Sequence, residues 1–215
     1  MADSLPPDGC HHYTDLGEVP WDIQKYWQQR YSIFSRYDEG IWMTDDAWFG
    51  ITPEPVANKI AEHLSRAPEE ATTVIDVFAG AGGNTIAFAR SPRWEKVVAI
   101  ERDPRAIACA KHNAEIYGVA DKIQWIAGDC FEILRNETYL FFELKRPSDS
   151  IFNLSTMQPY SIVEIYDALA VICPDIALYL PRTSDLRQLA KYASADRKVE
   201  VIHYCMEGAS KHAQL

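Results

Sequence analysis

Val-Ile-Asp-Val-Phe-Ala-Gly-Ala-Gly-Gly-Asn, residues 74–84, decides the fold of this chain. An apolar stretch of strand character ends in a glycine-rich turn, and the residues beyond the turn have helical character. Glycines in such a turn permit a positive φ and let the backbone approach a ligand closely. In open parallel sheets, this junction forms the ligand-binding crevice at the carboxyl end of a central strand. The candidate site at this turn comprises Phe78, Gly80, Gly82, Gly83 and Asn84.

Strands and helices alternate along the chain on both sides of this stretch. We expect strands at residues 72–77, 96–100, 122–126, 139–144, 176–180 and 198–205. We expect helices at residues 53–64, 84–90, 103–117, 161–172 and 184–192, the first capped by Thr52 and with Pro53 at its first position. This alternation predicts an α/β fold, a doubly wound and mostly parallel sheet of the Rossmann-like type with helices on both faces.

The residues that precede the first of these helices differ in composition from the rest. Residues 1–20 are rich in Pro, Asp and Gly, which predicts a disordered tail. Residues 21–52 are dense in aromatic side chains, and helical spacing relates Ile23, Trp27, Tyr31 and Phe34. They predict an aromatic-rich helical extension, which either packs on the domain or forms a lid that contributes rings to a ligand. The α/β domain would then span residues 53–215.

The bulk properties restrict the partners of the chain. Its 215 residues carry a formal net charge of −10, which argues against the basic face that non-specific nucleic-acid binding needs. Binding of one nucleotide or one RNA cap stays open, because stacking and a few charges suffice. Five cysteines without a C-x-x-C pair argue against a disulfide framework or a zinc ribbon. Cys10-His11-His12 lacks a second ligand pair and no apolar run could span a membrane, so we expect neither a metal nor a membrane partner.

Acidic residues follow three successive predicted strands. Asp76 stands where the first strand meets the glycine turn, and a carboxylate there suits a cation such as the amino group of methionine but would repel a pyrophosphate. Glu101 ends the second strand about 20 positions beyond the turn, where an acid commonly holds ribose hydroxyls. Asp129 follows the third strand and either accepts the adenine amino group or caps the next helix. With a G-x-G-G turn and no P-loop lysine, this arrangement is typical of class I S-adenosylmethionine-dependent methyltransferases.

Segments spread over residues 25–211 carry a more specific resemblance. The chain resembles the trimethylguanosine synthase family in KYWQQRYSIFSRYDEGI, WFGITPE, DVFAGAGGNTIAFA, NAEIYGVADKI, DSIFNLSTMQPYS, YLPRTSDLRQLA and HYCMEGASK. The resemblance implies transfer of two methyl groups from S-adenosyl-L-methionine to the exocyclic N2 of 7-methylguanosine caps. It also implies small nuclear or nucleolar RNA (snRNA or snoRNA) as the partner. The implied location is the nucleus or nucleolus, with the cytoplasm as a further one.

The resemblance also implies roles for particular side chains. Phe49 and Thr52 would line the cofactor side of the site, Asn113 would lie near the cap base, and Arg182 would meet the cap phosphates. Arg182 follows Pro181 at the end of a predicted strand, where a guanidinium can fork onto a phosphate or pair with a surface carboxylate. Asn113 lies in a predicted helix, so solvent exposure is the alternative to a substrate contact. We expect the protein to be a monomer.

The sequence departs from the family after the fourth predicted strand. The family carries Ser-Pro-Pro-Trp-Gly-Gly-Pro there; its polar groups orient the N2 amine and its tryptophan stacks on the cap guanine. Residues 131–150 read FEILRNETYLFFELKRPSDS, without Pro-Pro, tryptophan or glycine, so no catalytic residue is assigned between Phe131 and Ser150. Trp42 could replace the stacking ring, with packing against the extension as the alternative. We therefore expect weak cofactor binding and little or no cap methylation.

A second departure lies at the end of the sequence. The family continues into a last, antiparallel strand where this sequence ends at Leu215, so we expect a C-terminally truncated domain with unpaired strand edges. Both breaks are abrupt and lie beside undamaged segments, which favours a misread or alternatively spliced message over a decayed paralogue. The alternatives to cap methylation are a non-catalytic protein of the same fold and a methyltransferase for another substrate.

Overall fold

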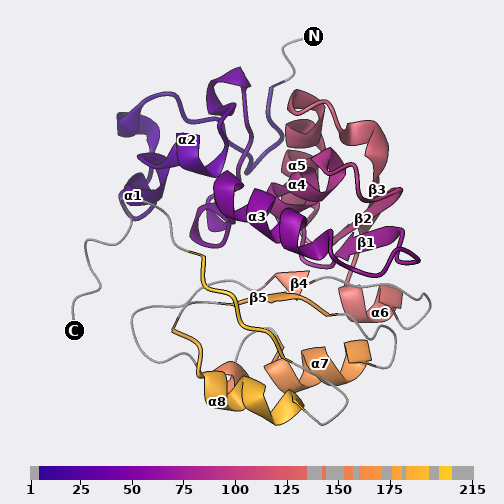
Figure 1. Cartoon of the computed structure of the whole chain (residues 1–215). Coiled ribbons are helices and arrows are strands. Elements are labelled where there is room, and N and C mark those ends of the chain that lie inside the picture. Colours follow the sequence, from indigo (N-terminus) through magenta and orange to yellow (C-terminus); the bar gives the residue numbers. More distant parts are fainter. Residues whose placement is uncertain are drawn as a thin grey trace.

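The computed structural model describes residues 5–134, 142–143, 153–156, 160–170, 176–180, 183–193 and 199–204. Three neighbouring strands, β1 (Thr73–Asp76), β2 (Lys96–Glu101) and β3 (Ile123–Ala127), form a parallel sheet in the order β1-β2-β3. A second parallel sheet pairs β4 (Phe142–Glu143) with β5 (Leu178–Tyr179), and β4 lies next to β1 (Figure 1). Every described strand pair is therefore parallel, as the alternation of strands and helices predicts.

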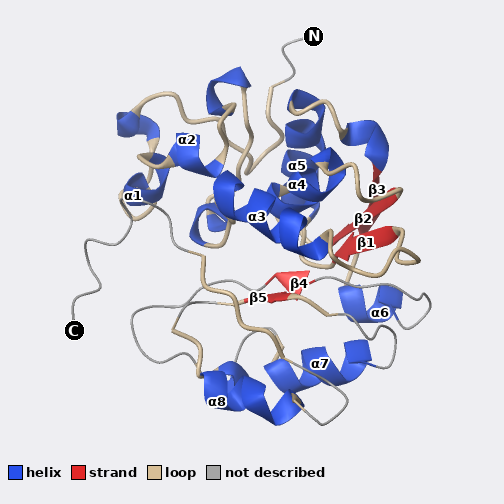
Figure 2. Ribbon diagram, in the orientation of Figure 1, coloured by secondary structure: helices blue, strands red, loops and turns tan. Residues whose placement is uncertain are grey.

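Helices lie on both sides of these strands (Figure 2). One side carries α3 (Glu54–Leu64), α4 (Gly83–Arg90) and α5 (Pro104–Ile116). The other side carries α6 (Cys130–Leu134), α7 (Ile162–Ala170) and α8 (Leu186–Leu189), as Figure 1 shows. Two short helices, α1 (Gln24–Trp27) and α2 (Arg30–Ile33), belong to the N-terminal extension. No described helix is long and apolar enough to cross a bilayer.

The strands alternate their side chains between two hydrophobic cores. Val74, Val97 and Ala99 belong to the core that also contains residues of α3, α4 and α5. The next residues along each strand, Ile75, Val98 and Ile100, belong to the core formed with α6 and α7. Because successive strand residues point to opposite faces, apolar residues in unbroken runs require two covered faces. This burial confirms the doubly wound α/β architecture.

The polar composition of the N-terminal tail is misleading about its structure. Residues 1–20 were expected to be disordered, but within residues 5–20 the side chains of Cys10, Tyr13 and Val19 are buried. The Tyr13 carbonyl accepts hydrogen bonds from the Trp27 indole nitrogen and the Tyr37 hydroxyl, both at 3.0 Å. The expectation of disorder is therefore wrong for residues 5–20, because tertiary contacts to the aromatic extension order a segment whose own composition is polar.

Several predicted boundaries also move. Pro53, not Thr52, is the N-cap of α3, and no side chain caps that helix. The expected helix at 184–192 is α8 followed by a 3₁₀ turn, Ala190–Tyr192. Residues 199–204 form no strand, so the strand expected at 198–205 is wrong for that described part. The predicted division at residue 52 stays a prediction, and one hydrophobic core draws side chains from both sides of it.

Candidate functional site

The carboxyl ends of β1, β2 and β3 bring the three predicted acids to one edge of the sheet. Asp76 is the last residue of β1 and Glu101 the last residue of β2. Asp129 follows β3 after Gly128, whose amide donates to the Glu101 carbonyl at 3.0 Å. Parallel strands in register therefore deliver acids far apart in sequence to one place, as expected from the pattern.

Asp76 is a buried carboxyl group that forms no ion pair with any described residue. Its side chain has no exposed surface, and its Oδ2 accepts a hydrogen bond from the Thr85 hydroxyl at 2.6 Å. Its Oδ1 makes no hydrogen bond of ordinary geometry within the described chain. Burial raises the pKa of Asp76 to about 6, although the Thr85 hydroxyl and the Phe78 amide act in the opposite direction. A carboxylate held this way favours an arriving cation, which is the role predicted for it.

The glycine turn contains one open position and two closed ones. Gly80 has φ +51°, and a side chain built on it would meet nothing closer than the Phe78 carbonyl oxygen at 4.0 Å. Gly82 has φ +94°, and an added Cβ would lie 3.3 Å from Cα and Cβ of Ala110 on α5. An added Cβ on Gly83 would lie 3.0 Å from Ile51 Cδ1. Gly82 and Gly83 thus allow close packing, whereas Gly80 leaves room beside the backbone.

Glu101 fixes the turn from the neighbouring strand. Its Oε2 accepts from the Gly80 amide and its Oε1 from the Asp103 amide, both at 2.9 Å. The side chain is only partly buried, so the lone pairs that the amides leave free can still face a ligand. Asp103, in turn, caps α5 by accepting from the Arg105 amide. The predicted ribose acceptor is therefore held at the open glycine.

Asp129 is engaged on both of its oxygens. Its Oδ1 accepts from the Phe131 amide at 2.9 Å, which makes it the cap of α6, and its Oδ2 accepts from the Tyr160 hydroxyl. Burial disfavours its charge, but the Tyr160 hydroxyl and two backbone amides outweigh burial, so its pKa lies below the ordinary value. Asp129 therefore caps a helix, which is one of the two roles that the sequence predicts for it. Tyr160 was missed, and its position beside Asp129 had no signal other than its place in the MQPYS segment.

The other predicted cofactor residues surround the glycine turn less directly. Thr52 is fully buried, and its hydroxyl accepts from the Asn84 amide at 3.3 Å. Phe78 is partly buried against the core that contains α6 and α7. Phe49 packs edge-on against Tyr26, with ring centroids 5.4 Å apart. The structure brings Thr52 and Asn84 together; contacts of these residues with a cofactor stay predictions.

Asn113 binds the extension to the glycine turn. It has no exposed surface, and its amide donates to the carbonyls of Trp42 at 2.9 Å and Ala81 at 3.0 Å. Its Oδ1 accepts from the Trp42 amide at 2.8 Å. The solvent-exposed alternative is therefore wrong. These internal bonds give Asn113 a bracing role, and a contact with the cap base stays a prediction.

Trp42 has one face covered by a histidine. Its ring stacks on that of His112 with centroids 3.6 Å apart and an angle of 6° between the planes. The tryptophan is only 8% exposed, and a ring nitrogen of His112 lies 2.9 Å from the Gly40 carbonyl oxygen. Of the two readings for Trp42, packing against the extension and α5 is the one that these contacts support.

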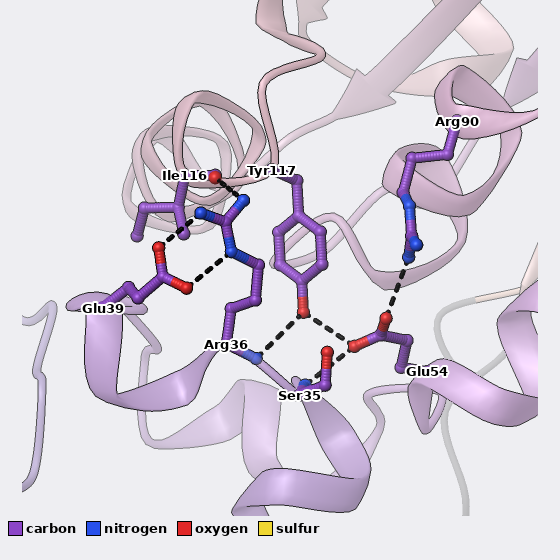
Figure 3. Close-up of polar contacts among 7 residues, drawn as sticks. All are labelled: Ser35, Arg36, Glu39, Glu54, Arg90, Ile116 and Tyr117. Carbon is purple, nitrogen blue, oxygen red and sulfur yellow. Dashed lines mark hydrogen bonds and ion pairs between the residues drawn. The ribbon is translucent and has the colours of Figure 1, made fainter.

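Glu54, the first residue of α3, ties four segments together (Figure 3). One carboxylate oxygen pairs with Arg90 of α4 at 2.8 Å. The other accepts from the Ser35 amide and from the Tyr117 hydroxyl, both at 2.7 Å. Burial works against its charge, but the Ser35 amide and Tyr117 hydroxyl prevail, so the pKa of Glu54 lies below its ordinary value. The extension is thereby anchored on the helices that flank the site.

Some predicted positions lie outside the residues that the structure describes. Arg182 and most of the segment between Phe131 and Ser150 lie outside the described residues. Within the described part, no group of three or more His, Cys, Asp or Glu side chains could hold a metal. Two residues of the Cys10-His11-His12 segment make hydrogen bonds within the protein. The Cys10 thiol donates to the Arg105 carbonyl oxygen at 3.5 Å, and a ring nitrogen of His12 lies 2.9 Å from the Ile41 carbonyl oxygen.

The parallel sheet, the glycine turn and the strand-end acids define a class I S-adenosylmethionine-dependent methyltransferase. The profile of the RNA cap guanine-N2 methyltransferase family matches residues 71–214, and the chain belongs to this family. Its reaction is methylation of the cap guanine at N2.

Two trimethylguanosine synthases are similar in sequence. The one from Schizosaccharomyces pombe is 36% identical over 208 residues, covering 90% of this chain and 84% of that protein. The one from Saccharomyces cerevisiae is 32% identical over 201 residues, covering 81% of this chain and 58% of that protein. A crystal structure described as a methyltransferase from Porphyromonas gingivalis W83 shares the fold, with a TM-score of 0.62 at 14% identity, over 85% of this chain and 49% of the other.

The residues present fit the methyl donor of this class. Gly80 leaves space beside its backbone, and Glu101 and Asp129 are partly exposed acids at the ends of the two neighbouring strands. The buried Oδ1 of Asp76 makes no ordinary hydrogen bond within the described chain. An ammonium group of the cofactor could supply that bond, either directly or through an ordered water. Acceptors for an amino group, for hydroxyls and for an exocyclic amine thus lie along one edge of the sheet.

Proposed function

We propose that this chain binds S-adenosylmethionine at the ends of β1, β2 and β3 and that its RNA partner is a 7-methylguanosine-capped small nuclear or nucleolar RNA. The observation that carries the proposal is the placement of Asp76, Glu101 and Asp129 at the ends of neighbouring parallel strands, with Glu101 bonded to the open Gly80, in a member of the cap guanine-N2 methyltransferase family. A nuclear or nucleolar location follows from such an RNA partner, and fluorescence microscopy of the tagged protein tests it.

Each acid would do a different task. Asp76 would attract the amino-acid end of the cofactor through its unshared charge. Glu101 would accept from the ribose hydroxyls while its bonds to backbone amides keep the glycine turn in place. Asp129 would accept from the adenine amino group. Bound in this way, the cofactor supplies an electrophilic methyl group, and the protein's contribution is to hold the acceptor amine in line with it.

We further propose that the chain as it stands transfers methyl groups poorly. Residues 131–150 lack the Pro-Pro, tryptophan and glycines with which the family orients the cap guanine. Positioning supplies most of the rate in a transfer of this kind, so the loss of the orienting loop affects turnover more than cofactor binding. A non-catalytic role is the second candidate, and the same observation favours it.

Calorimetric titration with S-adenosylhomocysteine tests the cofactor site. Glu101→Ala should weaken binding at least about tenfold, because a site that loses a hydrogen-bonding acid leaves ligand hydroxyls unpaired. Glu95→Ala, at an exposed acid just before β2, serves as the matched control and should leave the affinity unchanged. Absence of binding by the unsubstituted chain would remove the proposed cofactor site.

A methyl-transfer assay on 7-methylguanosine-capped RNA tests the turnover. The chain as it stands should give little product, and a variant with Ser-Pro-Pro-Trp-Gly-Gly-Pro inserted between Phe131 and Ser150 should give more. Binding of 7-methylguanosine diphosphate in preference to guanosine diphosphate tests the cap. Robust dimethylation by the unaltered chain would show that another segment replaces the loop. Cofactor binding without transfer by either form would favour the non-catalytic role.

A further inference from the structure

Tyr160 occupies an unusual position just before α7. Its hydroxyl donates to Oδ2 of Asp129, across 31 residues of sequence. Its ring stands edge-on to that of Phe131, with centroids 4.4 Å apart and an angle of 88° between the planes. Tyr160 is therefore an aromatic ring with a hydrogen-bond donor, placed on the acid that follows β3.

The oxygen that Tyr160 engages is the one available to a ligand. Oδ1 of Asp129 already accepts from the Phe131 amide at 2.9 Å and belongs to the cap of α6. Oδ2 is left for a donor from outside the helix, and the Tyr160 hydroxyl takes it. Adenine offers the same combination, a flat aromatic ring with an N–H donor at its edge.

We propose that Tyr160 is an internal competitor for adenine, whose hydroxyl must leave Asp129 before the 6-amino group of the cofactor can bind there. This inference rests on the proposed function and adds a regulating residue to the same site. The contact is strong in the free protein, because a hydrogen bond to a carboxylate exceeds one between neutral groups. The Asp129 carboxylate also raises the pKa of Tyr160 to about 12, so the hydroxyl keeps its proton and its donor role at neutral pH.

Competition has a signature that a specificity contact lacks. Loss of the Tyr160 hydroxyl removes from the free protein a bond that an adenine ligand must break, so ligands that carry the 6-amino group should bind more tightly. Purine riboside lacks the 6-amino group and need not displace the hydroxyl from Asp129, so the ratio of adenosine affinity to purine riboside affinity should rise in Tyr160→Phe. Asp129→Asn should instead reduce the ratio, because it removes the carboxylate on which the 6-amino group binds.

The experiment is calorimetric titration of the full chain with S-adenosylhomocysteine, adenosine and purine riboside. Tyr160→Phe should bind S-adenosylhomocysteine about tenfold more tightly than the unsubstituted chain, as expected for one lost bond to a charged group. Tyr192→Phe is the matched control, because Tyr192 is also partly buried and contacts Tyr166 through its ring, and it should bind unchanged.

The outcomes separate this inference from the proposed function. Tighter binding of adenosine ligands by Tyr160→Phe with a raised ratio supports the inference, and tighter binding with an unchanged ratio overturns it. Equal or weaker binding by Tyr160→Phe, while the unsubstituted chain binds, overturns competition and leaves the cofactor site standing. If neither chain binds S-adenosylhomocysteine, the proposed function and the inference fail together.

Discussion

Replacing Asp76 with asparagine should stabilise the free protein at neutral pH and not in acid. The unfolded carboxyl titrates near its ordinary value of 3.8, and the folded one near about 6, because it is buried. Between these values the folded state binds more protons, so this group's contribution to stability falls as the pH rises from about 4 to about 6. The difference of about two units corresponds to a penalty of about 3 kcal/mol above pH 6.

The asparagine carries no charge, and its carbonyl oxygen can still accept from the Thr85 hydroxyl. Its amide would replace Oδ1, which makes no ordinary hydrogen bond, so part of the gain is lost and we expect a net gain of about 1–3 kcal/mol at pH 7.5. For a chain of this length, that gain raises Tm by roughly 3–10 °C. At pH 4 the gain should largely vanish, since the folded carboxyl is then protonated.

Thermal and urea unfolding of Asp76→Asn at pH 4 and pH 7.5 measures the effect. Asp121→Asn, at an exposed acid far from the buried strand end, is the control and should show no such pH dependence. A variant that gains nothing at pH 7.5, or gains equally at both pH values, would refute the reasoning that the buried carboxyl is ionised at a cost. The same substitution should weaken S-adenosylhomocysteine binding, so stability and function oppose one another at this residue.

Three further substitutions test the packing around the site by urea denaturation. Asn113→Ala should cost about 3 kcal/mol, because it leaves three backbone groups buried without partners; a cost near zero would contradict the bracing role. Glu54→Gln should cost about 1 kcal/mol through its Arg90 pair, whereas Glu62→Gln, in an exposed pair with Lys59, should change nothing measurable. Gly82→Ala should cost about 2–4 kcal/mol, and Gly118→Ala, where the added Cβ meets nothing, about 1 kcal/mol; equal costs would exclude the close approach of α5.

The fold was predictable because local and tertiary preferences agree in its first half. Strands at residues 73–76, 96–101 and 123–127 lie within a residue or two of their predicted bounds. Their apolar runs need two covered faces, and their connecting helices carry caps or a glycine turn that are legible in sequence. The three acids follow from the same logic, because parallel register places successive strand ends together.

The features that the sequence did not predict depend on contacts between distant segments, which a sequence pattern does not reveal. Nothing local predicts that Asn113 binds the backbone of Trp42, or that Tyr160 reaches Asp129. The same holds for residues 5–20, whose polar composition concealed buried anchors such as Tyr13. The sequence therefore predicted that the three acids lie at one edge of the sheet, but it did not predict the side chains that brace the site, such as Asn113, or that bind one of its acids, such as Tyr160.

The anchoring of the extension on α5 has a consequence for how the chain is made. Cys10 contacts Arg105, Gly40 contacts His112 and Trp42 contacts Asn113, at separations of 95, 72 and 71 residues. During synthesis, the aromatic segment emerges before its docking surface on α5, which is translated 71 to 95 residues later. Its rings therefore stay in water until α5 has been made, and closing such long loops makes their docking a slow step. The charges interspersed among those rings, such as Asp22, Lys25 and Arg30, keep the waiting segment from associating with other nascent chains.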